Sequence, residues 1–382
     1  MSTIFDYLTW RGDLDFSRSP FNLVDNIILC QIAYLPFDGI VPGPDERAEI
    51  SVKDAIHILY QKLQDKDEYA KLPFLLKEDA ALISALRYAN RFGNCRLRGY
   101  VNHIDTGREI QFSALCINTG DGSHFIAYRG TDMTFVGWKE DFNMSFSKVV
   151  PSQLAAVEYL AKMAKKIKNP FEKGLFSKGP LRIGGHSKGG NLAVYAASQC
   201  GKKIQRRITA VYSNDAPGFH ESVISGEGFA AIRERIHTFI PQSSVVGMLF
   251  EHGNTYKVIK SSGNGLLQHE IYTWEVTYND MVYVDDVTQG SRFLSKTLKD
   301  WITTLDNTRR EQFIEALYSI LCASQAKTIP ELEHSWPKSA ARMLQSLGDI
   351  DESTKDIIKT SLTALFHSAR NNIDTLLKKQ NK

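Results

Sequence analysis

The sequence of 382 residues lacks the marks of several protein classes. Its five cysteines include no C-x-x-C pair, which argues against a disulfide scaffold and a cysteine-built zinc site and fits thiols in a reducing compartment. No run of about 18 apolar residues occurs, and charged residues interrupt the N-terminal segment where a signal peptide needs an apolar stretch. We therefore expect a cytoplasmic protein without a transmembrane segment.

An excess of one charge is also missing. Lys and Arg number 46 and Asp and Glu 43, so the net charge is only +3, and like charges form no long block. This balance gives no basic surface for a nucleic-acid partner. The H-E-x-x-H and D-x-D-x-D-G patterns are absent and histidines are not paired at ligand spacing, so we expect neither a metal nor a cofactor.

With 43% hydrophobic residues, the chain can form a large core, and the spacing of these residues indicates its organisation. Helical spacing dominates residues 20–100. From Gln111 the spacing becomes that of strands, and residues 112–118 and 124–130 flank a loop with two glycines, which predicts a hairpin. Strands and helices then alternate, as in a sheet with crossover helices, until helical spacing returns at about Ser291. The segments expected after the hairpin are helices 152–167 and 191–200 and strands 181–185, 208–213, 235–240, 256–261, 271–276 and 281–284.

The most informative motif is Gly185-His186-Ser187-Lys188-Gly189, which lies between a short apolar strand and an Ala/Leu-rich helix. In that context, G-x-S-x-G predicts a nucleophile elbow, a tight strand-to-helix turn that presents a serine hydroxyl. Both glycines are needed because the backbones approach closely there. The amide of Lys188, at the N-terminus of the helix, is placed to donate to a developing oxyanion. The alternative, a phosphate-binding turn, lacks the G-x-G-x-x-G or G-K-[ST] spacing.

A second motif, Tyr128-Arg129-Gly130-Thr131, leaves the second strand of the predicted hairpin. Acyl transfer requires two oxyanion donors, one after the nucleophile and one from an early strand-end loop. The backbone N–H of Thr131 is the candidate for the second donor. The alternative is a strand end closed by a turn, with Arg129 and Asp141 as a structural ion pair.

These motifs resemble those of the class 3 lipases: Y-R-G-T-D followed by Trp and Asp, then G-H-S-x-G-G-x-L-A. The segments YLTWRGDLDF and PFNLVDNIIL resemble a bacterial branch of that superfamily. The resemblance implies an α/β-hydrolase fold and a Ser-His-Asp triad acting on esters. We expect an α/β protein with a mostly parallel central sheet and added N-terminal and C-terminal helices. Residues 1–290 form the expected catalytic domain, with a helical insertion at about 40–100, and residues 291–382 a helical extension.

The sequence departs from the class 3 pattern directly after the serine. These lipases carry leucine there, whereas this chain has Lys188. The lysine either packs its stem while its ammonium group reaches water, or it holds an anionic group of the substrate.

The acid of the expected triad is the second departure. The position of the class 3 aspartate corresponds to Ser243 or Ser244 here. Since an acid is still needed to orient the histidine, we assign this role to Asp215, directly after the expected strand 208–213. The alternative for Asp215 is helix capping or turn formation before Pro217.

For the base, the order Ser, Asp, His along the chain requires a late histidine. His269 precedes the expected strand 271–276 and resembles the family's catalytic histidine segment. His252 and His220 are rivals, and His186 is expected to shape the elbow.

The sequence thus predicts a serine hydrolase that cleaves carboxylic esters, with a small-molecule or lipid ester as substrate and lipid contact at the surface as an option. Ser187, His269 and Asp215 form the expected triad, and the amides of Thr131 and Lys188 the oxyanion hole. The helical segments 40–90 and 291–382 are expected to form a lid or pocket walls. An acyltransferase on the same triad and a catalytically silent interaction protein stay open as alternatives.

Overall fold

In the computed structural model, the described residues are 1–65, 77–105, 107–108, 110–131, 140, 144, 149–167, 179–263 and 265–304, with a few isolated residues further on. Within them, nine strands form one sheet whose spatial order follows the sequence. The strands are β1 (Ile50–Ser51), β2 (Arg96–Asp105), β3 (Ile110–Asn118), β4 (His124–Tyr128), β5 (Leu181–His186), β6 (Ile208–Asn214), β7 (Ile236–Pro241), β8 (Tyr256–Ile259) and β9 (Tyr283–Val284).

The sheet is mixed, so the expectation of a mostly parallel central sheet holds only for its middle strands. Strands β4 to β8 run parallel, whereas β1 to β4 pair antiparallel, as do β8 and β9. The physical reason lies in the connections. Only a few residues join β2 to β3 and β3 to β4, and a connection that short can link only antiparallel neighbours.

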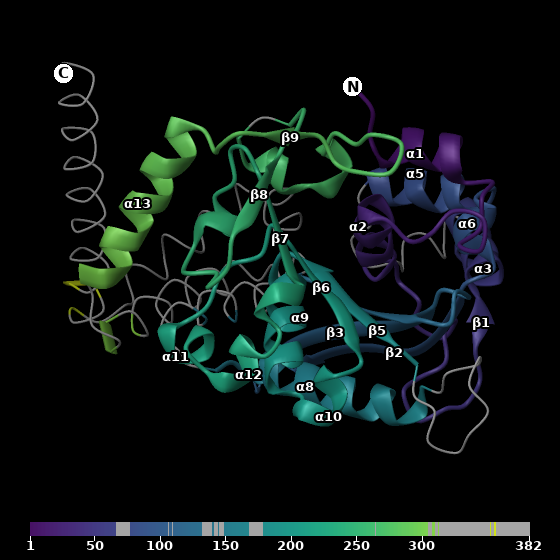
Figure 1. Cartoon of the computed structure of the whole chain (residues 1–382), viewed down its shortest axis with the longest axis horizontal. Helices are drawn as coiled ribbons and strands as arrows, with labels where there is room; N and C mark the ends of the chain where they lie inside the picture. The colour runs from purple at the N-terminus through teal and green to yellow at the C-terminus, as the bar shows by residue number, and fades with distance from the viewer. Residues whose placement is uncertain are drawn as a thin grey trace.

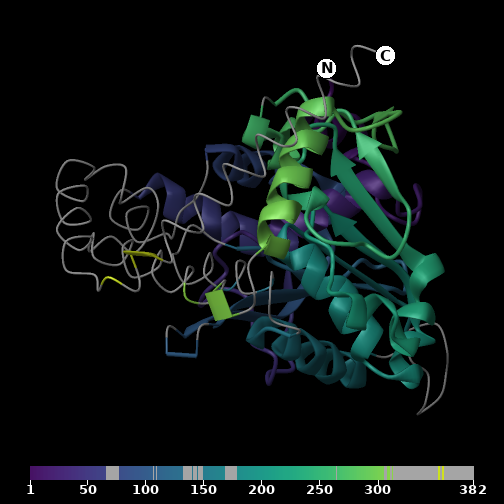
Figure 2. The same ribbon diagram turned by 90° about the vertical axis from the view of Figure 1, so that its left-hand side faces the viewer.

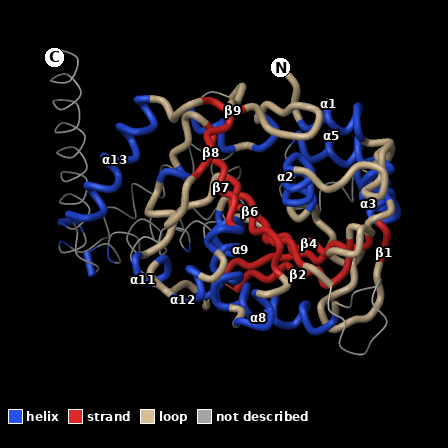
Figure 3. The backbone as a smooth tube through the Cα atoms, viewed as in Figure 1, coloured by secondary structure: helices blue, strands red, loops and turns tan. Residues whose placement is uncertain are grey.

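Helices cover both faces of this sheet. Figures 1 and 3 show the strands as a band, with α2 on one side and α8 and α9 on the other. In the described part of the chain, the α-helices are α1 (Ile4–Arg11), α2 (Leu23–Ile32), α3 (Val52–Gln64), α5 (Lys77–Leu86), α6 (Asn90–Gly93), α8 (Pro151–Lys166), α9 (Lys188–Gln199), α10 (Lys202–Gln205), α11 (Glu221–Ile224), α12 (Glu227–Ala230) and α13 (Gln289–Thr304).

Strand β3 shows why both faces are covered. Its apolar residues alternate between two hydrophobic cores: Leu115 and Ile117 pack in the core that includes α2, and Ala114 and Cys116 in the core that includes α8 and α9. All four side chains are fully buried. A strand with apolar residues on both faces is stable only between two layers of helices.

The predicted hairpin is confirmed. Strands β3 and β4 pair antiparallel, with Asn118 opposite His124. Gly120 and Gly122 in the connecting loop have φ values of 81° and 85°, a region that glycine enters without steric cost.

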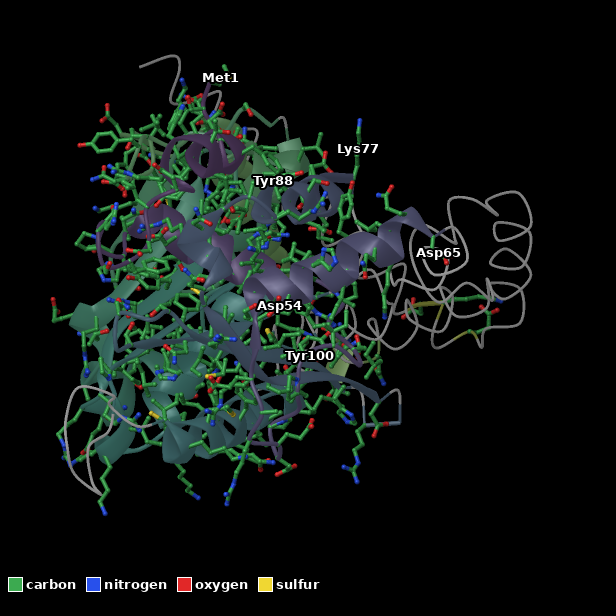
Figure 4. All side chains as sticks on the ribbon, turned by 90° about the vertical axis from the view of Figure 1, so that its right-hand side faces the viewer. Met1, Asp54, Asp65, Lys77, Tyr88 and Tyr100 are labelled. Carbon is green, nitrogen blue, oxygen red and sulfur yellow. The ribbon has the colours of Figure 1, made fainter. Side chains whose placement is uncertain are left out.

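In the N-terminal third, some elements match the expected helices and others were not expected. Helices α2 and α3 lie where the helical spacing places them, and Figure 4 allows α3 to be followed from Asp54 to Asp65. Helix α1 and strand β2 were not predicted. The signal for α1 is its capping box, in which Thr3 and Asp6 bond to each other's backbone N–H groups.

The expected strand 271–276 is wrong, and the segment forms the 3-10 helix η4 (Ile271–Thr273) instead. The chain turns because the amides of Thr273 and Trp274 bond to the carbonyls of Glu270 and Ile271. The indole N–H of the fully buried Trp274 also donates to Gln268 O. A strand lies further on, at β9, as expected for residues 281–284.

Helix α13 begins at Gln289, close to the expected return of helical spacing at Ser291. Figure 2, which faces the left-hand side of Figure 1, shows it as a light green helix in front of the sheet. Ser291 Oγ donates to Ser244 O and Ser295 Oγ to Met248 O, so its first turns contact the loop after β7. Most of the predicted extension 291–382 lies outside the described residues. Within them, no helix combines the length and apolar character that crossing a bilayer requires.

Candidate active site

The predicted strand–turn–helix around Ser187 is present. Strand β5 ends at His186, α9 begins at Lys188, and Ser187 between them has φ 57° and ψ −135°. Its amide donates to Asn214 O at the end of the neighbouring strand β6. Ser187 is partly exposed and lies at the N-terminus of a twelve-residue helix, where the dipole favours negative charge.

Two glycines permit this turn, as the motif requires. A Cβ atom at Gly185 would lie 2.1 Å from the backbone of Gly189, and one at Gly189 would lie 2.1 Å from Tyr128 O. No side chain fits at such distances. The elbow and the end of β4 are therefore packed backbone to backbone.

The loop after β4 carries Thr131 and lies against the elbow. At Gly130, the residue before Thr131, a Cβ atom would lie 2.7 Å from His186 O and 3.0 Å from Ser187 Cβ. Thr131 is partly exposed. Of the two amides expected to form the oxyanion hole, that of Lys188 thus comes from the residue after Ser187 and that of Thr131 from the loop packed against the elbow.

Both expectations for the side chain of Lys188 are wrong, because its ammonium group reaches neither water nor the site. The residue is 1% exposed, and Nζ forms an ion pair with Glu140 Oε2 at 3.0 Å. Nζ also donates to the carbonyl and side-chain oxygens of Gln111 at 2.9 and 2.7 Å. The physical reason is that the buried carboxylate of Glu140 requires a buried positive charge. Asp141, the expected ion-pair partner of Arg129, lies outside the described residues.

Asp215 lies beside the elbow because of the strand register. His186 pairs with Asn214, so Ser187 and Asp215 follow neighbouring strands at the same level. The carboxylate of Asp215 is buried and makes three hydrogen bonds. Oδ1 accepts from Ser244 Oγ at 2.5 Å and from the amide of Gly247 at 3.1 Å, and Oδ2 lies 2.7 Å from His269 Nδ1.

His269 ends the 3-10 helix η3 (Gly265–His269), between β8 and β9. Its imidazole is about a quarter exposed and meets Asp215 through Nδ1. An aspartate accepts a hydrogen bond from Nδ1–H, which leaves Nε2 as the nitrogen that takes up a proton. Its carbonyl oxygen accepts a hydrogen bond from His186 Nε2 at 2.7 Å, so His269 is held beside the residue that precedes Ser187.

The alternative residues have other partners. His252 Nε2 donates to Gly247 O, and His220 caps α11 through Nδ1. Ser244 Oγ donates a hydrogen bond to Asp215 Oδ1, and the amide of Ser243 donates one to Gln268 Oε1. The two serines at the expected acid position therefore contact the Asp215 and His269 segments.

Tyr34 is a site residue that the sequence analysis missed. Its hydroxyl accepts from the amide of Gly130 at 3.0 Å and lies 3.2 Å from both Nδ1 and O of His186. It follows α2, about 150 residues before the elbow, and no motif surrounds it. Glu270 directly follows His269 in the sequence, and burial raises the pKa of its carboxyl group.

In the described part of the chain, no group of three or more His, Cys, Asp or Glu side chains is arranged to hold a metal ion.

A family model described as Mbeg1-like matches residues 86–319, which is more than half of the chain. The chain belongs to the Mbeg1-like family. The matched residues of this Mbeg1-like protein include Thr131, Ser187, Asp215 and His269, whereas Tyr34 precedes them.

No curated protein matches the sequence. Among solved structures, a crystal structure of M37 lipase matches with 12% identity and a TM-score of 0.36, over 59% of this chain and 68% of that one. A native propeptide complex of Rhizomucor miehei lipase matches with 12% identity and a TM-score of 0.34, over 56% of this chain and 70% of that one.

Proposed function

We propose that this Mbeg1-like protein is a serine hydrolase that cleaves carboxylic esters, with a small-molecule or lipid ester as substrate. The observation that carries the proposal is the 2.7 Å contact between His269 Nδ1 and Asp215 Oδ2, made beside a serine in the elbow conformation. A strained serine and a buried carboxylate at neighbouring strand ends, with an imidazole bonded to the carboxylate, are the parts of a nucleophilic triad.

In the proposed reaction, His269 Nε2 takes the hydroxyl proton of Ser187 as Oγ bonds to the ester carbonyl carbon. The amides of Thr131 and Lys188 donate to the oxyanion, and the start of α9 adds a favourable dipole. His269 then gives its proton to the departing alkoxide, which leaves as the alcohol. Water, deprotonated by His269, attacks the acyl group on Ser187, and the carboxylic acid leaves as the serine regains its proton. Asp215 keeps its charge and stabilises the imidazolium.

The test combines a fluorophosphonate probe with a panel of esters of increasing acyl length. We expect wild-type protein to form an adduct at Ser187 and to hydrolyse at least one ester. Ser187→Ala should form no adduct and should lower turnover by about 10⁴-fold or more. The matched control is Ser222→Ala, since Ser222 lies on the exposed helix α11.

The two alternative functions are separate outcomes of this test. Folded wild-type protein that gives no adduct and hydrolyses no ester favours the catalytically silent protein. An adduct at Ser187 together with an acylated product, when alcohols or amines are supplied as acceptors, favours the acyltransferase. Hydrolysis that Ser187→Ala leaves unchanged contradicts the assignment of the nucleophile.

A further inference from the structure

We infer that Tyr34 and His186 are positioning residues that hold the main chain of His269 against the oxyanion loop, the segment 129–131 that follows β4 and carries Thr131. The inference rests on the proposed function, because it explains how the proposed base keeps its place beside Ser187. Neither side chain carries out a step of the proposed reaction. Their hydrogen bonds to the site end on the backbone of Gly130 and of His269.

The hydrogen bonds form one continuous path. The amide of Gly130 lies 3.0 Å from the Tyr34 hydroxyl, which lies 3.2 Å from His186 Nδ1. On the other side of the same ring, Nε2 lies 2.7 Å from the carbonyl oxygen of His269. The path therefore begins one residue before Thr131 and ends on the residue proposed as the base.

The direction of each hydrogen bond follows from the chemistry of its ends. A carbonyl oxygen can only accept, so His186 Nε2 must carry a proton. Burial and the neighbouring imidazole of His269 hold the pKa of His186 well below its usual range, so the ring has a single proton and Nδ1 is an acceptor. Tyr34 then donates to Nδ1, with the backbone carbonyl of His186 as a second acceptor, and accepts from Gly130 N–H.

His269 depends on such contacts because it stands at the end of a short 3-10 helix rather than in a strand. Two further bonds hold this turn at the preceding residue, where Gln268 accepts from Trp274 Nε1 and from the amide of Ser243. The contact from His186 is made at His269 itself. A displacement of about 1 Å at a reacting group can cost about 10²-fold in rate. Loss of the path should therefore affect catalysis before stability.

The packing leaves little freedom in the path. The rings of His186 and His269 lie with centroids 4.4 Å apart, and the buried indole of Trp274 meets the His186 ring edge-on at 6.3 Å. At Gly130 a Cβ atom would lie 2.3 Å from the Tyr34 hydroxyl. The oxyanion loop can approach Tyr34 this closely because it has no side chain there.

The test compares three variants of the full chain. Tyr34→Phe removes the hydroxyl, His186→Phe keeps an aromatic ring without donor or acceptor, and His186→Gln keeps both in one amide. The matched control is Tyr283→Phe, whose hydroxyl bonds to Asp280 on the far strand β9. For each variant, kcat, KM, the rate of fluorophosphonate labelling and the melting temperature are measured.

We expect Tyr34→Phe and His186→Phe to lower kcat and the labelling rate about 10- to 100-fold with KM nearly unchanged. His186→Gln should regain most of the lost kcat, and the control should match wild type. The double variant Tyr34→Phe/His186→Phe should lose no more than His186→Phe alone, because both changes interrupt the same path.

An unchanged kcat in both single variants overturns the inference. It is equally overturned if their losses multiply in the double variant, or if His186→Gln is no better than His186→Phe. These results differ from failure of the proposed function, in which wild-type protein itself neither reacts with the probe nor hydrolyses an ester. That failure would remove the inference together with the function on which it rests.

Discussion

Ser244 donates a hydrogen bond of 2.5 Å to Oδ1 of Asp215, although the two residues follow different strands. Asp215 directly follows β6, and Ser244 lies in the loop after β7, which pairs with β6 in parallel. The serine therefore occupies the position that the lipase resemblance assigns to the acid, and it supports a carboxylate supplied by the neighbouring strand.

The first prediction compares these two residues. Asp215→Asn should lower kcat by about 10⁴-fold, because an amide in place of the carboxylate holds His269 in the wrong tautomer. Ser244→Ala should cost only about tenfold, because Asp215 keeps its bonds to Gly247 and His269. Steady-state ester hydrolysis measures both. Equal losses in the two variants would contradict the assignment of Asp215 as the acid.

The second prediction concerns Gly247. A Cβ atom here would lie 2.3 Å from Asp215 Oδ1, so Gly247→Ala must displace the carboxylate that orients His269. We expect kcat to fall about 10²-fold. Gly290→Ala is the control, because its Cβ would meet no atom within 4 Å. If Gly247→Ala keeps wild-type kcat, the carboxylate does not need its observed position.

The third prediction concerns the buried pair of Lys188 and Glu140. Lys188→Leu leaves the Glu140 carboxylate without its charge partner and should cost about 3–5 kcal/mol in unfolding free energy. Adding Glu140→Gln removes the uncompensated charge, so the double variant should be more stable than Lys188→Leu alone. Urea denaturation measures both. If Lys188→Leu is as stable as wild type, the pair contributes nothing to the free energy of unfolding.

The fourth prediction concerns the dependence of stability on pH. His124 is 5% exposed, and burial, with a smaller effect of Arg98, lowers the pKa of its imidazole to about 4. The folded state therefore binds fewer protons than the unfolded chain. The contribution of the neutral, buried His124 to the free energy of unfolding is fully present above the unfolded pKa of about 6.5. It is lost as the pH falls towards 4.

Between those pH values the loss should be on the order of 3 kcal/mol. Denaturation at several pH values should show that the unfolding free energy of His124→Phe depends less steeply on pH than that of wild type. His103→Gln, on the exposed part of β2, is the control. If the unfolding free energies of wild type and His124→Phe depend equally on pH, His124 is not the source of the pH dependence.

Much of the site's geometry could be predicted because it depends on local patterns. The elbow around Ser187 has a fixed need for small residues, and the hairpin loop with Gly120 and Gly122 needs positive φ values. Such requirements act within a few residues, and the sequence displays them. Asp215 and His269 were placed by chain order and resemblance, and the structure brings their side chains together.

What the sequence did not reveal depends on contacts between distant segments. Tyr34 joins the site through hydrogen bonds to residues about 100 and 150 positions away, and nothing in its neighbourhood marks it. Lys188 was expected to reach either water or an anionic group of the substrate, and its burial was missed because its partner Glu140 lies 48 residues before it. The alternation of residues 271–276 favours a strand, but bonds within the segment and from Trp274 to Gln268 turn the chain.

Ser187 and Asp215 are two of the three non-glycine residues with positive φ in the described part of the chain, the third being Phe250. Such conformations cost on the order of 1–3 kcal/mol each, and glycine would relieve most of that cost. Ser187→Gly should therefore yield a more heat-resistant but inactive protein, whereas Asp215→Gly would also lose the three hydrogen bonds of the buried carboxylate. Selection of variants for thermal resistance alone would favour loss of the proposed nucleophile, so any programme to stabilise this protein must screen for activity as well.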